Sequence, residues 1–571
     1  MSELREALGD EPSAPQYIKT VARRGYRFIA EVTSSTTEDT AERIKPPVFG
    51  VLRGGDSPAD DEPTIAVMDF TNVAGDAESS WLAAGIAETV TGDLRTLGRL
   101  RVVDRWRVSE AARRTDGSLE RVAQDLHARL VVVGSYQRNG PRVRITARVV
   151  DVVSGEALAD AKVDGPIDAI FALQDQVVEQ FARELGVVRP GSPAARSPAR
   201  ETANLDAYRA FCEGWLRLES LDVRELPHAI AAFERAVAAD PQYTLAYTGL
   251  ASAELARYET TRSDAEPAAG VLHRAVGHAR HAVHLDDSLA EAHATLAFVL
   301  VSDWRTEEAA AAARRAVALE PDNWRHLFRL GHASWGDERL RAAGRMLQLY
   351  PDFAFAHFQM AMVHVARGHL HEAEAVLRQG AAVQDRQIGR GGRYPALGLH
   401  WLLGLVRLAE DDHDEALQEF DRERTLAEPH RLYGREYAMA ALFGRGAALL
   451  RAHRDANAAE AFAGALQVYP DHVPAMLGRG LARGDTADGP GTTKTLDVLS
   501  RRRPIEAALV RAQIAAVRGD VQGALDALGG MLDAAPPGFA GWTIPVEPLL
   551  RYLHEDERFG PVLTRLSDRA R

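Results

Sequence analysis

Apolar residues recur with two different periods between positions 63 and 188. Over 80–97 they return every three or four positions, which is the spacing of one face of an α-helix. From 142 to 149 they alternate with arginine and threonine, as in a strand buried on one face, and Asn139-Gly140 just before is a strong hairpin signal. Further strands are predicted at 64–70, 100–103 and 130–136, and further helices near 107–113, 119–126 and 167–185. The pattern therefore predicts a small α/β domain over 63–188.

Residues 204–571 show instead the pattern of paired helices. Turn signals interrupt the helical spacing at Asp240-Pro241, Asp286-Asp287, Glu320-Pro321, Tyr350-Pro351, Gln384-Asp385, Glu428-Pro429 and Tyr469-Pro470. Two of the separations, 287 to 321 and 351 to 385, are 34 residues long. Matching small and bulky residues precede two of the turns, namely Ala229, Phe233 and Ala236, and Ala458, Phe462 and Ala465. Antiparallel helices need small residues where their backbones approach and one large side chain to fill the gap, so helical hairpins are predicted.

This period and these positions resemble the tetratricopeptide family over roughly residues 204–535. One hairpin cannot bury its own apolar face, so the resemblance implies a mainly α-helical solenoid of stacked repeats. The array is irregular, because 321 to 351 is short whereas 241 to 287, 385 to 429 and 429 to 470 are long. Residues 485–503 are expected to interrupt the array, and residues 547–571 are expected to form a capping helix pair.

Solenoids of this kind hold extended peptides in a groove. We expect most aromatic residues near the repeats to pack between helices and some to line such a groove; they are Trp304, Trp324, Trp335, Phe353, Phe355 and Phe358. A protein or peptide partner is therefore expected for the repeats.

Four motifs in the α/β stretch resemble the TolB amino-terminal-like domain. They occur in the right order and are IAVMDFTN at 65–72, WLAAGI at 81–86, VVGS at 132–135 and VRITARVVD at 143–151. That domain commonly precedes repeats in bacterial regulators. The resemblance implies a fold and no catalytic activity.

Two polar stretches separate these parts from each other and from a short head. Residues 33–62 and 189–203 lack periodic apolar residues, so both are interpreted as linkers. The head, residues 1–32, has the pattern of a helix end that stops at Gly9, followed by a β-hairpin with a cationic tip at 22–25. Such a tip suits a narrow DNA minor groove, where negative potential is concentrated.

The head resembles the C-terminal end of the winged-helix DNA-binding domain of OmpR/CadC-type transcription regulators. The matching motifs are LREALG at 4–9, for the end of the recognition helix, and TVARRGYRF at 20–28, for the wing. The resemblance implies a wing turn at Gly25 and core packing by Leu4, Tyr26 and Phe28. The candidate DNA-binding residues that it implies are Arg5, Lys19, Thr20, Arg23, Arg24 and Tyr26.

The head matches only the end of that domain. The early strands, the first two helices and most of the recognition helix have no counterpart, and a fragment of about 30 residues cannot bury a core alone. Its five acidic and five basic residues also leave no net positive field. Either the chain begins late relative to a longer ancestor or true start site, or the head is a relic. We therefore expect weak or absent specific DNA binding from this chain, although its ancestry points to transcription regulation.

Composition narrows the remaining functions. With 81 acidic and 68 basic side chains the net charge is −13, so any nucleic-acid binding must come from a local patch. A single cysteine, Cys212, excludes a disulfide within the chain and a cysteine-based zinc site. No run reaches the roughly 18 apolar residues of a membrane helix, and the N-terminus has no apolar core like that of a secretory signal, so a cytoplasmic protein without membrane contact is expected.

No motif for catalysis, cofactor or metal binding is found, so we expect a non-enzymatic protein without catalytic residues, cofactor or metal site. Residues 489–494 lack the spacing of a phosphate-binding loop and are expected to be an ordinary loop. His278 and His281 have a spacing that a metal site could use, but no third ligand is implied, so solvent-facing or groove-lining histidines are expected.

Three further features are expected to be structural rather than catalytic or ligand-binding. Asp69 is expected to cap the loop after its strand, and Cys212 is expected to be a buried apolar residue. A strip of arginines on one strand is expected to face solvent, and it consists of Arg142, Arg144 and Arg148.

Three functions remain open. The first is a bacterial transcription regulator whose head contacts DNA if complete, whose repeats bind a protein or peptide, and whose α/β domain couples the two or mediates self-association as a homo-oligomer. The second is an interaction scaffold that has lost its DNA-binding head. The third is a fragment of a nucleotide-cyclase-type regulator, since TolB-like and repeat regions also follow cyclase domains; the winged-helix remnant argues against it.

Overall fold

A computed structural model of the chain describes residues 18–21, 25–28, 63–97, 100–115, 117–187, 202–264, 266–389, 396–485, 490–536 and 538–571. The chain divides into two compact units, Met1–Pro58 and Ala59–Arg571. In the first unit, β1 (Ile18–Val21) pairs antiparallel with β2 (Gly25–Phe28). The hairpin predicted for the head is therefore present, but the described residues do not show a winged helix. Linker 33–62 and most of linker 189–203 lie outside the described residues.

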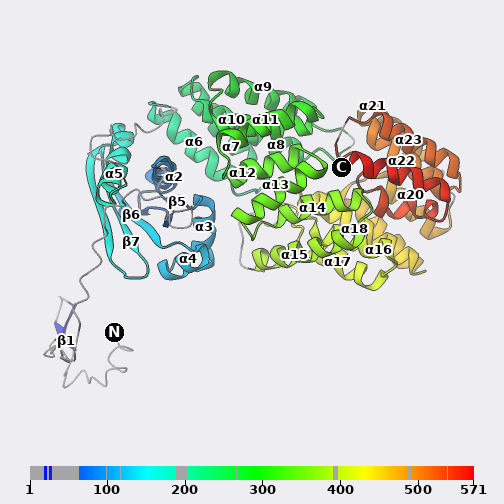
Figure 1. Cartoon of the computed structure of the whole chain (residues 1–571), viewed down its shortest axis with the longest axis horizontal. Helices are drawn as coiled ribbons and strands as arrows, with labels where there is room; N and C mark the ends of the chain where they lie inside the picture. Colours follow the sequence, from blue (N-terminus) through cyan, green and yellow to red (C-terminus); the bar gives the residue numbers. More distant parts are fainter. Residues whose placement is uncertain are drawn as a thin grey trace, which may run out of the picture. The chain divides into compact units, whose positions relative to one another are not determined.

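The second unit begins with a six-stranded sheet (Figure 1). Its strands are β3 (Thr64–Val67), β4 (Thr71–Asn72), β5 (Arg101–Val102), β6 (Leu130–Asn139), β7 (Arg142–Asp151) and β8 (Ala157–Pro166). Their order is β5-β3-β6-β7-β8, with β4 pairing β6 beyond the end of β3. Strands β5, β3 and β6 are parallel, whereas β6, β7 and β8 form an antiparallel meander whose first turn lies at Asn139-Gly140, as predicted.

Helices cover both faces of the parallel strands. They are α2 (Trp81–Thr96), α3 (Arg105–Arg114), α4 (Leu119–Leu126) and α5 (Ile170–Glu184), with the short 3-10 turns η1 (Ala77–Ser79) and η2 (Ile167–Ala169). Ile65 and Val67 of β3 pack in one core with α2 and α5, while Ala66 between them packs with α3 and α4. Because successive strand residues point to opposite faces, β3 is buried on both sides and its sequence is continuously apolar.

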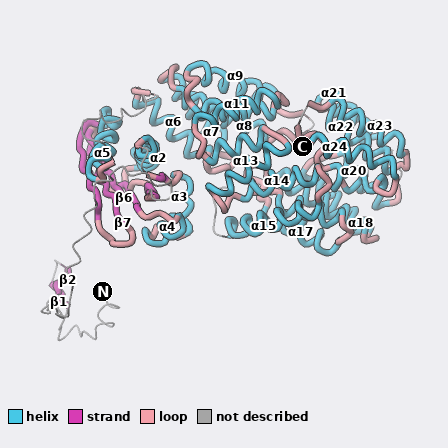
Figure 2. The backbone as a smooth tube through the Cα atoms, viewed as in Figure 1, coloured by secondary structure: helices cyan, strands magenta, loops and turns pink. Residues whose placement is uncertain are grey.

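Between 202 and 571, the described residues are mainly helical (Figure 2). The helices are α6 (Leu205–Leu218), α7 (Leu226–Ala239), α8 (Thr244–Glu259), α9 (Ala269–Leu285), α10 (Ala290–Ser302), α11 (Thr306–Leu319), α12 (Trp324–Ala333), α13 (Gly336–Leu349), α14 (Ala354–Ala366), α15 (Leu370–Gly389), α16 (Leu399–Ala409), α17 (His413–Leu426), α18 (Gly434–Arg451), α19 (Asp455–Val468), α20 (Val473–Arg483), α21 (Pro490–Arg502), α22 (Pro504–Val517) and α23 (Val521–Ala534). Each even-numbered helix packs against the helix that follows it in the chain. The even-numbered helices also contact each other, from α6 to α14 and from α16 to α22, and we call their shared surface the inner wall.

The small and bulky positions predicted from the sequence do pack between helices. The ring of Phe233 is fully buried, and a Cβ at Gly249 of the next repeat would lie 2.3 Å from it. Phe462 is buried in the same way, and a Cβ at Gly478 would lie 2.4 Å from its ring. Only glycine leaves room for the phenylalanine ring at these two positions.

The end of the array differs from the prediction in two places. Residues 485–503 do not simply interrupt the repeats, because they contain α21, and the loop expected at 489–494 includes the first turn of that helix. Residues 547–571 are not a capping helix pair. This part of the chain forms η3 (Ile544–Val546), η4 (Pro548–Leu553), η5 (Glu557–Phe559) and only one α-helix, α24 (Gly560–Arg569). Pro545 and Pro548 have no backbone N–H to donate, which prevents a continuous α-helix there.

The long repeats coincide with contacts between distant repeats. Two backbone hydrogen bonds of 2.9 Å join residues 221–223 to residues 430–432. Arg262, in the loop after α8, donates two hydrogen bonds of 2.9 Å to the carboxylate of Glu436 in α18. Arg262 belongs to the long spacing from 241 to 287, and residues 430–432 and Glu436 belong to the long spacing from 429 to 470. These long spacings therefore contribute contacts that join the first repeats to the repeat of α18.

The short repeat is completed by a buried arginine. Only two residues separate α12 from α13, and Arg339 lies beneath this junction with 2% of its surface exposed. Its guanidinium donates to the carbonyls of His332 at 2.9 Å and Ser334 at 3.0 Å. The side chain therefore satisfies carbonyls at the end of α12 that have no partner within the helix.

Candidate functional site

The structure places only part of the predicted DNA-binding set. Lys19 and Thr20 lie in β1 and Tyr26 lies in β2, where Thr20 is paired with Tyr26. Arg5, Arg23 and Arg24 lie outside the described residues. The three described candidates thus share one hairpin, and the DNA-binding role of the six residues stays a prediction.

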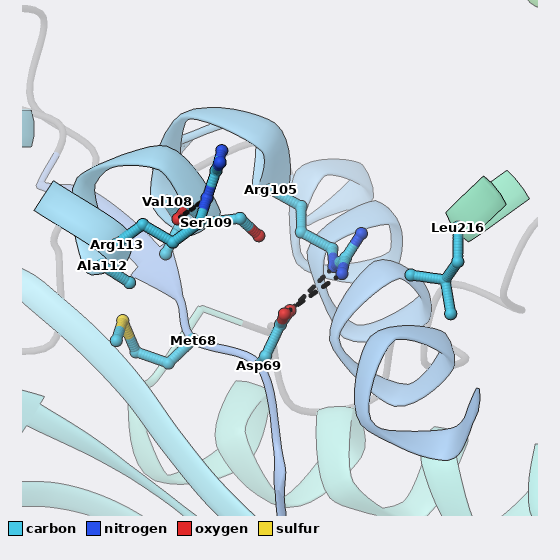
Figure 3. A pocket seen from close by; sticks show the side chains of 8 residues that line it. All are labelled: Met68, Asp69, Arg105, Val108, Ser109, Ala112, Arg113 and Leu216. Atoms are coloured by element: carbon cyan, nitrogen blue, oxygen red, sulfur yellow. Dashed lines mark hydrogen bonds and ion pairs between the residues drawn. The ribbon is translucent and has the colours of Figure 1, made fainter. Parts of the chain in front are cut away.

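A pocket of about 370 Å³ lies where the chain leaves β3 and β5 (Figure 3). These strands are neighbours, but the chain continues from β3 to α2 on one face of the sheet and from β5 to α3 on the other. Such a switch point, outside the carboxyl ends of parallel strands, is where open α/β sheets usually bind ligands. The volume is also in the range of small-molecule sites.

The pocket walls combine an ion pair with apolar side chains. The lining residues are Met68, Asp69, Arg105, Val108, Ser109, Ala112, Arg113 and Leu216. Figure 3 shows Arg105 pointing to Asp69, and its guanidinium donates to the two carboxylate oxygens at 2.9 and 3.2 Å. Asp69 thus pairs with a buried guanidinium among the described residues, and not with the backbone of the next loop as predicted.

Three carboxylates share the Arg105 guanidinium. Besides Asp69, it lies 3.9 Å from Glu88 of α2 and 4.0 Å from Glu219 at the end of α6. Burial opposes the charge of Arg105, but the three carboxylates outweigh this effect and raise its pKa. With its donors directed at carboxylates, Arg105 serves as a structural tie between the α/β domain and α6 rather than as an acid or base.

A second candidate site is a row of half-buried aromatic side chains on the inner wall. Phe298 of α10, Phe328 of α12 and Phe355 of α14 follow one another with ring centroids 6.2 and 6.0 Å apart, and we call them the aromatic row. Arg329 lies over Phe298 at 5.9 Å, and His332 packs against Phe298 at 4.9 Å. Aromatic faces of this kind bind apolar or aromatic side chains of a partner.

The surroundings of the aromatic row are mostly uncharged. Burial lowers the pKa of His332 to about 3, so its imidazole is neutral near pH 7. Arg329 is neutralised by Glu291, whose carboxylate lies 2.6 Å away. The row therefore favours an apolar partner segment over a highly charged one.

Residues 538–571, which we call the C-terminal segment, lie on another part of the inner wall. Turns η3 and η4 contact α14, α16, α18 and α22. Trp542 packs edge-on against Phe358 and Trp401, each with centroids 6.3 Å apart, and Ile544 and Leu550 are fully buried. The chain itself thus fills this part of the wall.

The aromatic residues singled out from the sequence mostly pack against one another. Trp304 and Trp335 lie beside Phe539 of the C-terminal segment, whereas Trp324 and Phe353 pack together. Only Phe355 belongs to the aromatic row. Phe298 and Phe328 were missed, because their helical spacing is that of ordinary packing residues. Arg105 was also missed, although its place just after a predicted strand is a signal that could have found it.

Three other side chains singled out from the sequence have ordinary structural environments. Cys212 is 7% exposed, and burial raises its thiol pKa to about 12, as expected for a buried apolar residue. His278 lies 3.6 Å from Glu254, and His281 packs against Tyr247. The described residues hold no group of three side chains able to bind a metal ion.

The arginine strip on β7 faces solvent, as predicted. Its members are half exposed and pair with Asp160 and Asp164 of β8. Over the described part of the chain, the structure has no helix long and apolar enough to cross a membrane.

Two family models match the chain. Residues 56–158 match the TolB amino-terminal domain, and residues 358–429 match the tetratricopeptide repeat. A TolB amino-terminal domain followed by tetratricopeptide repeats is thus present, as the sequence motifs predicted. Neither match covers the hairpin of the head.

A curated relative and two solved structures share parts of the chain. Putative adenylate cyclase 3 of Rhizobium meliloti is 29% identical over 254 residues, which are 43% of this chain and 42% of that protein. The chain therefore spans less than half the length of this relative. A tetratricopeptide repeat protein from Parabacteroides merdae covers 49% of this chain with 99% of its own, at 14% identity and a TM-score of 0.34. Human IFIT1, as a dimer with m7Gppp-AAAA, covers 64% with 80% of its own chain, at 15% identity and a TM-score of 0.39. These scores are low, so neither structure carries an argument about function.

Proposed function

We propose that the chain is a non-enzymatic interaction scaffold whose repeats bind a protein or peptide. The tetratricopeptide repeats support a protein-interaction role in general terms. The aromatic row is the single observation that locates the proposed binding surface on the molecule. Its three rings stay partly exposed on adjacent inner helices, whereas the C-terminal segment covers another part of the wall.

The partner proposed for the aromatic row is a segment with apolar or aromatic side chains. Half-buried rings gain free energy when a partner removes their remaining surface from water. Aromatic residues are also enriched among those that dominate the energy of protein interfaces.

Affinity capture with the full chain tests this proposal. The unmodified chain, the double variant Phe298→Ala/Phe328→Ala and the control Tyr552→Ala are exposed to the same extract, after thermal unfolding has shown that each is folded. Tyr552 is a matched control because it is an exposed aromatic residue outside the row. We expect the double variant to retain a given partner about tenfold less than the other two. Equal retention by all three would show that the row is not the binding surface.

A role beside a nucleotide cyclase is a second proposal, favoured by the similarity to a putative adenylate cyclase. In this role the chain is a regulatory scaffold, and the cyclase activity belongs to another protein or region. The test incubates the purified chain with ATP and Mn²⁺ and measures cyclic AMP. We expect none above a blank without protein, and clear formation of cyclic AMP would contradict the non-enzymatic proposal.

Transcription regulation through the head remains a prediction. The β1–β2 hairpin is the observation that favours it. A mobility-shift assay compares this chain with one extended upstream in frame, and we expect specific binding to be weak or absent for the shorter form. Tight, salt-resistant binding by the shorter form would overturn that expectation.

A further inference from the structure

The α/β domain touches the solenoid at two separate places. One is α6, the first helix of the inner wall, and the other is the region where α12 begins and α13 ends. Helices α8 and α10 lie between these places along the inner wall. The α/β domain therefore bridges the first repeat and a repeat more than 100 residues further along the chain.

The contact with α6 belongs to the core of the α/β domain. Tyr208 of α6 packs edge-on against Trp81 at 5.7 Å and Phe171 at 4.9 Å, and its hydroxyl donates to the carbonyl of Gly85 at 2.9 Å. A Cβ at Gly85 would lie only 3.0 Å from that hydroxyl. Together with Cys212, Tyr208 is buried in the same cluster as the sheet. Separating α6 from the domain would expose this core to water.

The second contact is polar and is made by α3 and the residue before it. Asp104 accepts a hydrogen bond from Arg325 of α12 at 3.3 Å. Arg107 donates at 3.4 Å to the carbonyl of the residue before Tyr350, and its guanidinium lies 5.0 Å from the centre of the Tyr350 ring. The Tyr350 hydroxyl donates to Glu110 at 3.3 Å.

The two contacts resist opening to different degrees. Glu110 and Tyr350 are buried while the α3 contact is closed, and water reaches their polar groups only when it opens. Water then replaces the broken hydrogen bonds and the ion pair at small net cost, and these bonds of 3.3 to 3.4 Å are longer than the usual range. Water cannot replace the aromatic packing at α6, because exposing apolar surface is unfavourable. The α3 contact is therefore the weaker of the two.

We propose that the α/β domain is a releasable clip: it is anchored permanently on α6 and holds α12 and α13 through the polar contact of α3, which opens first. While the clip is closed, it fixes the distance between the first repeat and the repeat of α12, and so the spacing of the helices between them. When the clip opens, α8, α10 and α12 are free to change their spacing, as stacked repeats do. Phe298 and Phe328 of the aromatic row lie on two of these helices. The clip itself needs no partner and can be tested without one.

Hydrogen–deuterium exchange on the full chain tests the clip. The variant Asp104→Asn/Tyr350→Phe removes the charge of one bond and the donor of another while keeping the shapes of the side chains. We expect exchange in α3, the first turn of α12 and the end of α13 to become about five- to tenfold faster, with α2 and α6 unchanged. The control Arg314→Gln breaks a surface ion pair of 2.6 Å with Glu338 in the same repeats and should leave all of these segments unchanged. Equal acceleration of α2 and α6, or no acceleration of α3, would overturn the proposal.

A distance measurement provides a second, independent readout. Spin labels on Arg113→Cys in α3 and Asp352→Cys just after α13 report the separation of the two sides of the clip. The native Cys212 is buried, so it does not compete for the label. We expect one narrow distance distribution in the otherwise unmodified chain and an added longer population in the Asp104→Asn/Tyr350→Phe background. An identical distribution in both backgrounds would show that α3 is not a releasable contact.

Discussion

The C-terminal segment and helix α3 both pack against the solenoid, but they do so with opposite chemistry. The segment buries Ile544, Leu550 and Leu553 completely against the inner helices. Helix α3 touches α12 and the end of α13 through hydrogen bonds, an ion pair and one arginine over a ring. Apolar burial makes the first contact part of the core, whereas the second depends on long polar bonds that water can replace once the contact opens. Chemistry, rather than position on the solenoid, therefore distinguishes the permanent contact from the releasable one.

The largest loss of unfolding free energy is expected from Leu550→Ala in the C-terminal segment. Leu550 is fully buried in η4, so the truncation should lower the free energy of unfolding by about 2–5 kcal/mol. A denaturant titration of the full chain measures this. Tyr552→Ala in the same turn is the control, because Tyr552 is 56% exposed and should change the value by only about 0.5 kcal/mol. Equal costs for the two variants would show that the segment is not part of the core.

A smaller change, in the pH dependence of the unfolding free energy, is expected from Glu547→Gln in the same segment. Burial raises the pKa of Glu547 from 4.5 to about 7, so between these values the folded chain binds a proton that the unfolded chain has lost. Stability from this group is therefore present at low pH and is lost as the pH rises towards 7. From about pH 5 to about pH 8, the unmodified chain should lose about 2 kcal/mol more unfolding free energy than Glu547→Gln. Unfolding titrations at the two pH values measure it, and an equal loss in both chains would contradict a raised pKa.

Tyr350→Phe tests the polar side of the comparison. It removes the hydroxyl that donates to Glu110 but keeps the ring under Arg107. The free energy of unfolding should fall by about 1–2 kcal/mol, because the buried carboxylate of Glu110 loses the hydroxyl that donates to it. If the cost in a denaturant titration reaches that of Leu550→Ala, the α3 contact is as strong as the core contact and the distinction between them fails.

The smallest change in unfolding free energy is expected from Arg314→Gln. Arg314 pairs with Glu338 on the surface of the repeats, and such exposed pairs contribute about 0.5 kcal/mol or less. The expected change in unfolding free energy is therefore close to the error of the titration. A loss of unfolding free energy above about 1 kcal/mol would mean that surface ion pairs help to hold these repeats together. The strength of the polar α3 contact would then also be underestimated.

The repeats show which packing features a local sequence pattern predicts and which it does not. Phe233 and Phe462 were predicted to fill the gaps between helices, and both are buried against glycines of neighbouring helices. The long and short spacings were also visible in the sequence, but their purpose was not. One long repeat carries Arg262 to Glu436, and the short repeat is completed by the buried Arg339. The first contact joins residues far apart in the chain, and the second is made by one side chain beneath a helix junction, so neither leaves a periodic trace.

The candidate sites were less predictable than the fold. Asp69 was expected to cap a loop, because the spacing around one carboxylate cannot show that a buried arginine lies opposite. Phe298 and Phe328 have the same spacing as buried core residues, so the sequence does not distinguish a partly exposed ring from a fully covered one. The path of residues 538–571 along the inner wall depends on the space that neighbouring helices leave open, which no local pattern records.

The sequence by itself determined most of the element types, the order of the α/β domain and the repeats, and the positions of small and bulky residues between paired helices. These features follow from local hydrogen bonding and from the period at which apolar side chains meet one face. Only the tertiary structure decided that Arg105 ties three carboxylates together, that the C-terminal segment fills part of the inner wall, and that α3 reaches Tyr350. These contacts join residues that are far apart in the chain, so they depend on how the helices and strands pack together and no local pattern records them.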